Sequence, residues 1–174
     1  NKTKTFEKNG MAEAIKSLCD FLPITKVVAI TVSGFAARVV ASKGIRQPIL
    51  AVTNNEDLAR GFNVYSGTKG VLCKTKFYKN RLDHIPECIK YLWKTNEINK
   101  KDMILVVSLG YPVSGRRMNF IQTHYVKDLV KVLSWKWNKV VKKFIFTVTT
   151  GRAGQETLYR ILQEYSINCL SAFE

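Results

Sequence analysis

Short apolar runs alternate with segments of helical period along most of this chain, and this alternation restricts the fold more than any other feature. Apolar runs of this length are typical of parallel strands that are buried on both faces. Turn residues such as Ser33-Gly34 and Asn54-Asn55 separate them from segments whose apolar residues recur every three or four positions. The predicted strands are 26–31, 48–53, 71–74, 103–108 and 120–126, and the predicted helices are 11–21, 35–43, 56–62 and 82–96. This order predicts a three-layer α/β/α fold around a mostly parallel sheet.

The pattern continues beyond residue 126. Apolar residues recur at helical spacing from 126 to 141, residues 144–150 alternate as in a strand, and 155–165 have a helical period. No linker rich in Pro or Ser precedes this part of the chain. We therefore expect one domain over residues 1–126 and an appended helix–strand–helix over 127–174 that packs on that domain or extends its sheet.

Ligands of open α/β sheets bind in the crevice at the carboxyl ends of the strands. This rule directs attention to three loops, at residues 31–36, 53–57 and 108–119. In the first loop, Thr31, Ser33 and Gly34 lead from a predicted strand into a predicted helix. Hydroxyl groups, a glycine that admits close backbone approach and the free N–H groups of a helix start suit a phosphate. Simple capping of the helix by Ser or Thr is the alternative.

The third loop contains Ser114, Gly115, Arg116 and Arg117 after a buried strand. The guanidinium of Arg presents a fork of donors that matches phosphate oxygens. An exposed basic turn is the alternative interpretation. If the first and third loops meet at one edge of the sheet, they form a single anion site, and we expect phosphate or a sugar phosphate there.

The charge of the chain is strongly positive. It has 28 Lys and Arg against 13 Asp and Glu, a net charge of +15. Such a charge favours nucleic acid, an anionic membrane surface or phosphorylated metabolites as partners. Most of the basic residues are lysines spread along the chain, so a solvated surface is the alternative. Trp135 and Trp137 interleave with lysines as in single-strand binders, although a core-facing Trp137 explains the pattern as well.

Chemistry-bearing clusters are scarce in the sequence. The cysteines Cys19, Cys73, Cys88 and Cys169 are scattered, and with His84 and His124 they match no metal-ligand spacing. We expect buried thiols in a reducing compartment, the cytoplasm or alternatively an organelle. No catalytic triad or carboxylate pair is evident, so no catalytic residue is predicted. No apolar run is long enough to span a membrane, no signal segment is visible, and the missing initiator Met suggests a fragment.

Three segments together resemble the C-terminal α/β domain of pyruvate kinase. Residues 26–37 (KVVAITVSGFAA) resemble its opening strand, loop and helix, and residues 48–60 resemble its next strand–turn–helix. Residues 102–115, with DMILVVS and PVSG, are similar to its last stretch before the terminal strand. The likeness covers roughly residues 11–126 and implies a five-stranded, mostly parallel sheet. The segment after residue 126 is foreign to the family.

The resemblance also implies that catalysis and regulation belong to different domains. In pyruvate kinase the phosphotransferase chemistry, with its magnesium and potassium ions, belongs to a separate barrel that a chain of this size does not hold. We therefore expect no cofactor in this chain. The C-terminal domain of the family forms a tetramer contact and often binds a sugar phosphate such as fructose 1,6-bisphosphate. Its phosphate loop corresponds to Thr31, Ser33 and Gly34, and its effector-covering loop to Ser114, Gly115 and their neighbours.

At one position the chain departs from the effector-binding members. They usually have a further hydroxyl where this chain has Ala36, next to the bulky Phe35, so one phosphate contact is lost. The alternatives are compensation by Arg116 and Arg117 or a different anion in the pocket. Two functions follow as expectations. The first is the regulatory and assembly domain of a pyruvate kinase, inactive by itself, in a homo-oligomer. The alternative is a stand-alone relative that serves as a basic binding or scaffold subunit in an RNA-containing or organellar assembly.

Overall fold

The computed structural model describes residues 2–77, 82–109 and 118–135, with the side chains of residues 10 onward. The chain divides into two compact units, Asn1–Trp137 and Asn138–Glu174, and every described residue belongs to the first. The predicted strand at 144–150 and the predicted helix at 155–165 therefore lie outside the described residues. The domain boundary after residue 126 stays a prediction.

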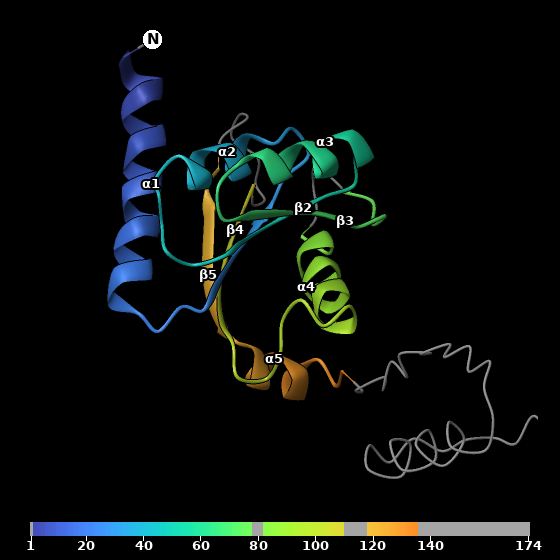
Figure 1. Ribbon diagram of the computed structural model, residues 1–174. Coiled ribbons are helices and arrows are strands. Elements are labelled where there is room, and N and C mark those ends of the chain that lie inside the picture. The colour runs from blue at the N-terminus through green and yellow to red at the C-terminus, as the bar shows by residue number, and fades with distance from the viewer. Residues whose placement is uncertain (1, 78–81, 110–117, 136–174) are drawn as a thin grey trace, which may run out of the picture. The chain divides into compact units, whose positions relative to one another are not determined.

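The helices and strands alternate along the first unit (Figure 1). Helix α1 precedes the sheet, and each of the first two strands is followed by a helix on the same face. In chain order the elements are α1 (Lys2–Phe21), β1 (Lys26–Ile30), α2 (Phe35–Ala41), β2 (Ile49–Thr53), α3 (Glu56–Gly61), the 3-10 helix η1 (Phe62–Val64), β3 (Thr68–Leu72), α4 (His84–Lys94), β4 (Met103–Ser108), β5 (Phe120–Tyr125) and α5 (Val126–Val132).

The strands form a five-stranded sheet in the order β3-β2-β1-β4-β5. The first four are parallel, with Ala29 of β1 opposite Ala51 of β2 and Val107 of β4. Among the described strands only β5 is antiparallel, and it pairs with β4. This confirms the predicted α/β fold with a mostly parallel five-stranded sheet. It also places the carboxyl ends of β1, β2 and β4 side by side.

Each face of the sheet has its own hydrophobic core, because alternate side chains of a strand point to opposite sides. The first core holds Val27 and Ala29 of β1 with the buried faces of α1 and α2 and with Phe62. The second core holds Val28 and Ile30 with residues of α4 and the start of α5. Figure 1 shows α2 and α3 on one side of the sheet and α4 and α5 on the other. Helices on both faces explain why the strand sequences are continuously apolar.

Three elements differ from their sequence-based bounds by more than two residues. Helical spacing was predicted from residue 126 to 141, but helix α5 ends at Val132, because Leu133 caps it and Ser134 adopts a positive φ of 50°. Helix α1 begins at Lys2 rather than at residue 11, so the polar stretch before Met11 is helical although it has no apolar stripe. Strand β3 covers Thr68–Leu72 rather than 71–74. Lys69 and Gly70 in its first half have low strand propensity, but they are strand because each residue of β3 pairs with β2, beginning at Thr68 opposite Ile49.

Gly70 stands in β3 where the backbone of α3 approaches the strand closely. A Cβ at Gly70 would collide with the backbone carbonyl oxygen of Ala59 in α3. The backbone N–H of Gly70 donates to Oδ1 of Asn63 at 3.0 Å, so α3, η1 and β3 are joined at this point. Glycine is required here because another chain segment approaches the strand backbone.

A polar network joins the amino ends of β1 and β4. The buried carboxylate of Asp102 accepts hydrogen bonds from Oγ1 of Thr25 at 2.8 Å, from Nζ of Lys26 at 3.2 Å and from the backbone N–H of Asn99 at 2.7 Å. Nζ of Lys26 also donates to the carbonyl oxygen of Glu97 at 2.7 Å. Three hydrogen bonds offset the free-energy cost of removing this carboxylate from water. We therefore interpret Asp102 as a structural residue.

Candidate functional site at the carboxyl edge of the sheet

The loop after β1 leaves the sheet at Thr31, whose side chain is buried. The backbone N–H of Thr31 donates to the carbonyl oxygen of Val52 at 2.9 Å, which continues the ladder between β1 and β2 by one residue. Val32 and Ser33 then project to solvent. The hydroxyl of Ser33 is therefore accessible at this edge, whereas Thr31 is held against the neighbouring strand.

Gly34 adopts a left-handed backbone conformation, with φ of +77°, immediately before α2. A Cβ at this position would lie 2.9 Å from Nη1 of Arg38 and 3.0 Å from Cε1 of Phe62. Both its conformation and its close packing therefore require glycine. The loop is consequently held in one shape between α2 and η1, with no side-chain cap on the helix.

The structure adds Arg38, which the sequence-based analysis missed, to this loop. Nη1 of Arg38 donates a hydrogen bond to the carbonyl oxygen of Ser33 at 3.3 Å. In the described part of the chain, no acidic side chain forms an ion pair with Arg38. An exposed guanidinium that uses one of its donors in this way keeps others for an anion. Its position four residues after Gly34, one helical turn away, was the signal available in the sequence.

Hydroxyl residues also end the two strands that flank β1. Thr53 ends β2 and is fully buried, and Ser108 ends β4 with 2% of its surface exposed. Oγ1 of Thr53 accepts a hydrogen bond from the backbone N–H of Asn55 at 3.3 Å. Oδ1 of Asn55 caps α3 by accepting from the N–H of Leu58 at 2.9 Å, as the sequence predicts. The side-chain oxygens of Thr53 and Asn55 are thus used in hydrogen bonds within this loop and at the start of α3. Ser33 and Arg38 are the more accessible polar side chains at this edge of the sheet.

Ser114, Gly115, Arg116 and Arg117 lie outside the described residues. Their loop begins after Ser108, the last residue of β4, and β4 is the direct neighbour of β1. The strand order therefore brings the start of this loop to the same edge as Thr31. Participation of these four residues in an anion site stays a prediction.

An open groove of about 620 Å³ lies at the opposite edge, across the amino ends of β1, β2 and β3. Lys26, Lys69 and Glu97 are the charged residues that line it. Nζ of Lys69 lies 2.6 Å from Oε1 of Glu97, and Lys26 is paired with Asp102. Both lysines are therefore already neutralised, and the groove is less suited to an anion than the loop at Arg38.

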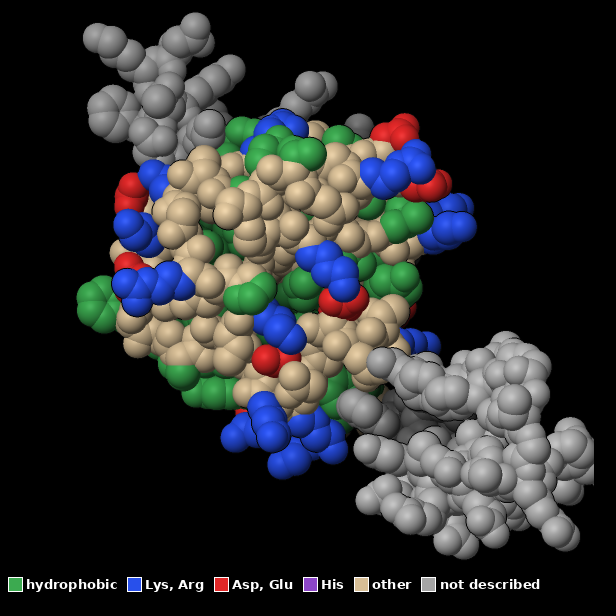
Figure 2. Space-filling model, viewed as in Figure 1, with side chains coloured by type: hydrophobic (Ala, Val, Ile, Leu, Met, Phe, Trp, Pro, Cys, Tyr) green, Lys and Arg blue, Asp and Glu red, His purple; other side chains and the backbone are tan. Residues whose placement is uncertain are grey.

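The basic side chains on one face of the described surface are dispersed. Figure 2 shows Lys and Arg in several separate groups on one face, some of them beside Asp or Glu. Lys43 pairs with Glu13 at 2.6 Å, and Arg60 pairs with Asp57 at 2.8 Å. On this face of the described residues, the distribution favours a solvated surface over one continuous track for nucleic acid.

No group of three or more His, Cys, Asp or Glu among the described residues has the arrangement of a metal site. Among the described helices, none combines the length and the apolar character that crossing a membrane requires.

A mostly parallel sheet covered on both faces, with a glycine-containing loop at its carboxyl edge, defines an open three-layer α/β domain. The model of the family described as "Pyruvate kinase, alpha/beta domain" matches residues 9–124, and the chain belongs to this family. This confirms the resemblance drawn from residues 26–37, 48–60 and 102–115.

Among curated proteins, the chain is similar to a protein named pyruvate kinase from Borreliella burgdorferi, with 23% identity over 130 residues. The alignment covers 74% of this chain and 27% of that protein. The chain thus spans about a quarter of the length of this relative.

Proposed function

We propose that the chain is the regulatory and assembly domain of a pyruvate kinase and that it binds a phosphorylated metabolite at the carboxyl edge of β1. Family membership over residues 9–124 is the observation that carries this proposal. The glycine-containing loop and the guanidinium of Arg38 at the edge where open α/β sheets bind ligands support it.

The ligand class follows from the donors at this edge. The hydroxyl of Ser33 and the guanidinium of Arg38 are exposed, and both hydrogen-bond a phosphate dianion readily. Ala36 supplies no hydroxyl, so we expect weaker binding than in family members that have one. Arg38 supplies a separate cationic donor at this loop, because its Nη1 lies at the carbonyl oxygen of Ser33.

Calorimetry with the whole chain tests this site. Inorganic phosphate, fructose 1,6-bisphosphate and the unphosphorylated sugar are titrated into wild type, Ser33→Ala and Arg116→Ala. We expect binding of the phosphorylated compounds only, weakened in both variants. Equal affinities in the three proteins would place the site elsewhere, and binding of the unphosphorylated sugar would refute an anion site.

The proposal includes two properties of the isolated chain. It has no phosphotransferase activity, because magnesium and potassium ions act in a barrel that it does not hold, and it forms a homo-oligomer through this domain. A coupled assay with phosphoenolpyruvate and ADP tests the first, and light scattering during size-exclusion chromatography tests the second. Turnover, or a monomer at micromolar concentration, would contradict these properties. The proposed location is the cytoplasm, with an organelle as the alternative.

A basic scaffold subunit is the second candidate, and the net charge of +15 is the observation in its favour. Contacts with many phosphates release counterions, so affinity for RNA would fall steeply with salt. We propose the regulatory domain as the better interpretation because the family matches over residues 9–124 and the basic side chains on the face in Figure 2 are dispersed. RNA binding by the chain that falls at least about a thousandfold between 50 and 200 mM salt would reverse this preference.

A further inference from the structure

Four exposed lysines gather at the end of the sheet where β4 begins. They are Lys100 and Lys101, in the turn before β4, and Lys127 and Lys131, on α5. The two segments are adjacent, because the backbone N–H of Val126 donates to the carbonyl oxygen of Asp102 at 3.0 Å. Figure 2 shows a close group of Lys and Arg side chains at the foot of the view, where Figure 1 shows α5 and the turn that leads into β4. We call the four lysines the α5 patch.

The α5 patch keeps its positive charge in the folded domain. Within the described part of the chain, none of its lysines forms an ion pair with a carboxylate. Two carboxylates of the preceding turn are engaged elsewhere, since Asp102 pairs with Lys26 and Glu97 pairs with Lys69. Asp128 is the acidic residue on α5 itself, and it is exposed. Four lysines beside one aspartate leave a surface that attracts anions.

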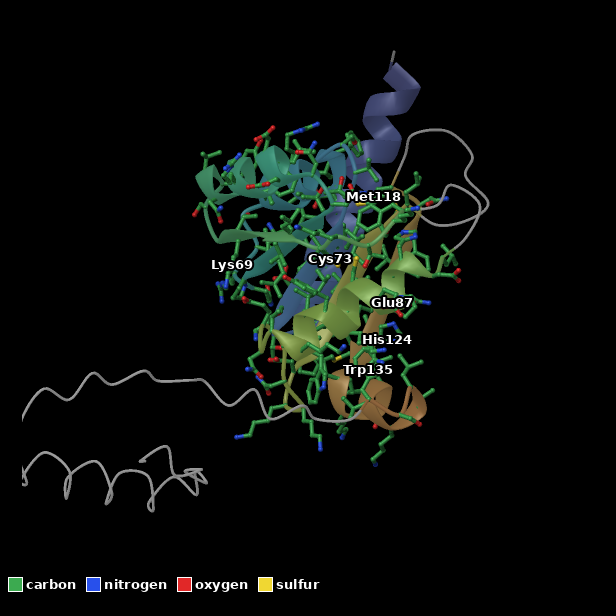
Figure 3. All side chains as sticks on the ribbon, turned by 90° about the vertical axis from the view of Figure 1, so that its right-hand side faces the viewer. Lys69, Cys73, Glu87, Met118, His124 and Trp135 are labelled. Atoms are coloured by element: carbon green, nitrogen blue, oxygen red, sulfur yellow. The ribbon has the colours of Figure 1, made fainter. Side chains whose placement is uncertain are left out.

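Helix α5 is held against the domain by its apolar face. That face consists of Val126, Leu129 and Val130, which lie in or against the core between the sheet and α4. Figure 3 shows Trp135, which follows the helix and packs against the same core, on the side toward α4. Because an α-helix has about 3.6 residues per turn, the opposite face, with Lys127 and Lys131, points to solvent.

Exposed apolar side chains lie next to these lysines. Val132 directly follows Lys131 and is 79% exposed, and Leu133 is 41% exposed. Tyr125 is 46% exposed, and Nζ of Lys127 lies 5.2 Å from the centroid of its ring. Lysines beside exposed aliphatic side chains are typical of surfaces that lie in the interface of an anionic membrane.

We propose that the α5 patch is an interaction surface for a membrane that contains anionic phospholipids. The negative head groups attract the four lysines, and Val132 and Leu133 enter the boundary between head groups and acyl chains. Nucleic acid fits the same surface less well. A single-strand binder stacks bases on accessible aromatic rings, whereas Lys127 lies over the ring of Tyr125 and the other exposed apolar groups are aliphatic.

The attachment is peripheral and depends on salt. Each lysine near an anionic membrane surface strengthens binding about fivefold, and this attraction falls off within a Debye length. The Debye length is about 30 Å at an ionic strength of about 0.01 M and about 8 Å at about 0.15 M. We therefore expect reversible binding that weakens about tenfold or more between these two conditions.

Co-sedimentation of the full chain with lipid vesicles tests this inference. One set of vesicles contains equal parts of phosphatidylcholine and phosphatidylserine, and the other contains phosphatidylcholine alone. We expect the chain to sediment with the first set and to stay in the supernatant with the second. Equal binding to both sets, or no binding to the anionic vesicles at low salt, would overturn the proposal.

Paired substitutions locate the surface. Lys127→Gln with Lys131→Gln should weaken binding to the anionic vesicles about twentyfold, and Lys100→Gln with Lys101→Gln should do the same. Lys74→Gln with Lys76→Gln is the matched control. It removes the same charge from exposed positions after β3, at the opposite end of the sheet, and at about 0.15 M salt it should change binding less than about twofold. Equal losses in all three variants would indicate net charge alone and refute the surface.

Two further measurements separate the membrane from other partners. Val132→Ser should weaken vesicle binding about threefold, because an apolar group no longer leaves water, whereas a purely electrostatic contact would be unchanged. Polyuridylate is titrated into the same variants at the same ionic strength. Tighter binding to polyuridylate than to the vesicles, lost in the Lys127 and Lys131 variant, would assign the surface to RNA and contradict the proposal. Circular dichroism checks that each variant is folded, as expected for substitutions of exposed side chains.

Discussion

Nη1 of Arg38 donates a hydrogen bond to the carbonyl oxygen of Ser33 at 3.3 Å. The guanidinium of a residue in the first turn of α2 therefore lies at the loop that precedes this helix. The same guanidinium group lies against Gly34. The loop therefore combines the hydroxyl residues Thr31 and Ser33 with the positive charge of Arg38. This combination makes Arg38 the side chain on which the proposed anion site depends most.

Replacing Arg38 by Gln should weaken binding of inorganic phosphate and of a sugar phosphate about tenfold or more, because a hydrogen bond to a charged group is lost. Isothermal titration calorimetry measures the change. Arg46→Gln is the matched control, since Arg46 is an exposed arginine that precedes β2 at the other edge of the sheet. The same loss in both variants would indicate a general effect of charge rather than a site.

Replacing Gly34 by Ala should lower the free energy of unfolding by about 1–3 kcal/mol, because its φ is positive and the Cβ would press on Phe62 and Arg38. Urea denaturation measures this loss. Gly10→Ala is the contrasting control, since Gly10 lies inside α1 with open space around it. That change should raise stability slightly by helix propensity. An unchanged Gly34→Ala protein would show that the loop relaxes freely.

Replacing Gly70 by Ala should be more damaging, with a loss of about 2–4 kcal/mol, since a backbone carbonyl rather than a flexible side chain blocks the new methyl group. The expected structural consequence is that α3 separates from β3. Gly61→Ala is the control, because Gly61 has a negative φ and no neighbouring atom in the way. Thermal melts of the two variants that coincide would refute the close approach of Ala59 and Gly70.

Replacing Asp102 by Asn should reduce the free energy of unfolding by about 1–3 kcal/mol, because Lys26 loses its ionic partner and one acceptor oxygen becomes a donor. Chemical denaturation measures this. Asp57→Asn is the control, because it removes an 87% exposed carboxylate that pairs with Arg60. Its effect on the free energy of unfolding should fall within experimental error. Similar losses in both variants would contradict a structural role specific to Asp102.

Acidification should destabilise the domain through His124. Burial lowers the pKa of His124 below its usual value of 6.5, and Nε2 lies 2.9 Å from Oε1 of Gln122. The unfolded chain therefore binds a proton at a higher pH than the folded domain does. Stability is fully present above about pH 6.5 and declines as the pH falls through the lower folded pKa. Urea midpoints at pH 7.5 and 5.5 should differ less in His124→Gln than in wild type, and an identical difference would exclude His124.

Local patterns identified most of the architecture. The predicted strands 103–108 and 26–31 match β4 and β1 to within one residue, because a run of buried apolar residues has clear ends. The cap at Asn55 was also predictable, since it depends on residues close in sequence. Strand β3 begins earlier than predicted because pairing with β2, rather than the propensity of its own residues, determines where it starts.

The candidate site was predictable in part. Thr31, Ser33 and Gly34 follow from turn chemistry at the end of a strand, and the structure places them in one loop between β1 and α2. The contact of Arg38 with that loop could not be predicted from the turn residues, because it depends on the position of α2 relative to the loop. The placement of Cys73 and Cys88 in one hydrophobic core required two elements to pack together, which no spacing rule indicates.

The amino-acid sequence alone determined the alternation of strands and helices, the turns between them and the family, because these depend on period and on short segments. Only the tertiary structure decided which distant residues meet. Thr25 and Asp102 are 77 positions apart, yet they share a hydrogen bond because β1 and β4 are adjacent in the sheet. Strand order is set by the packing of whole faces against helices, so it places Ser108 beside Thr31 in a way that no local pattern specifies.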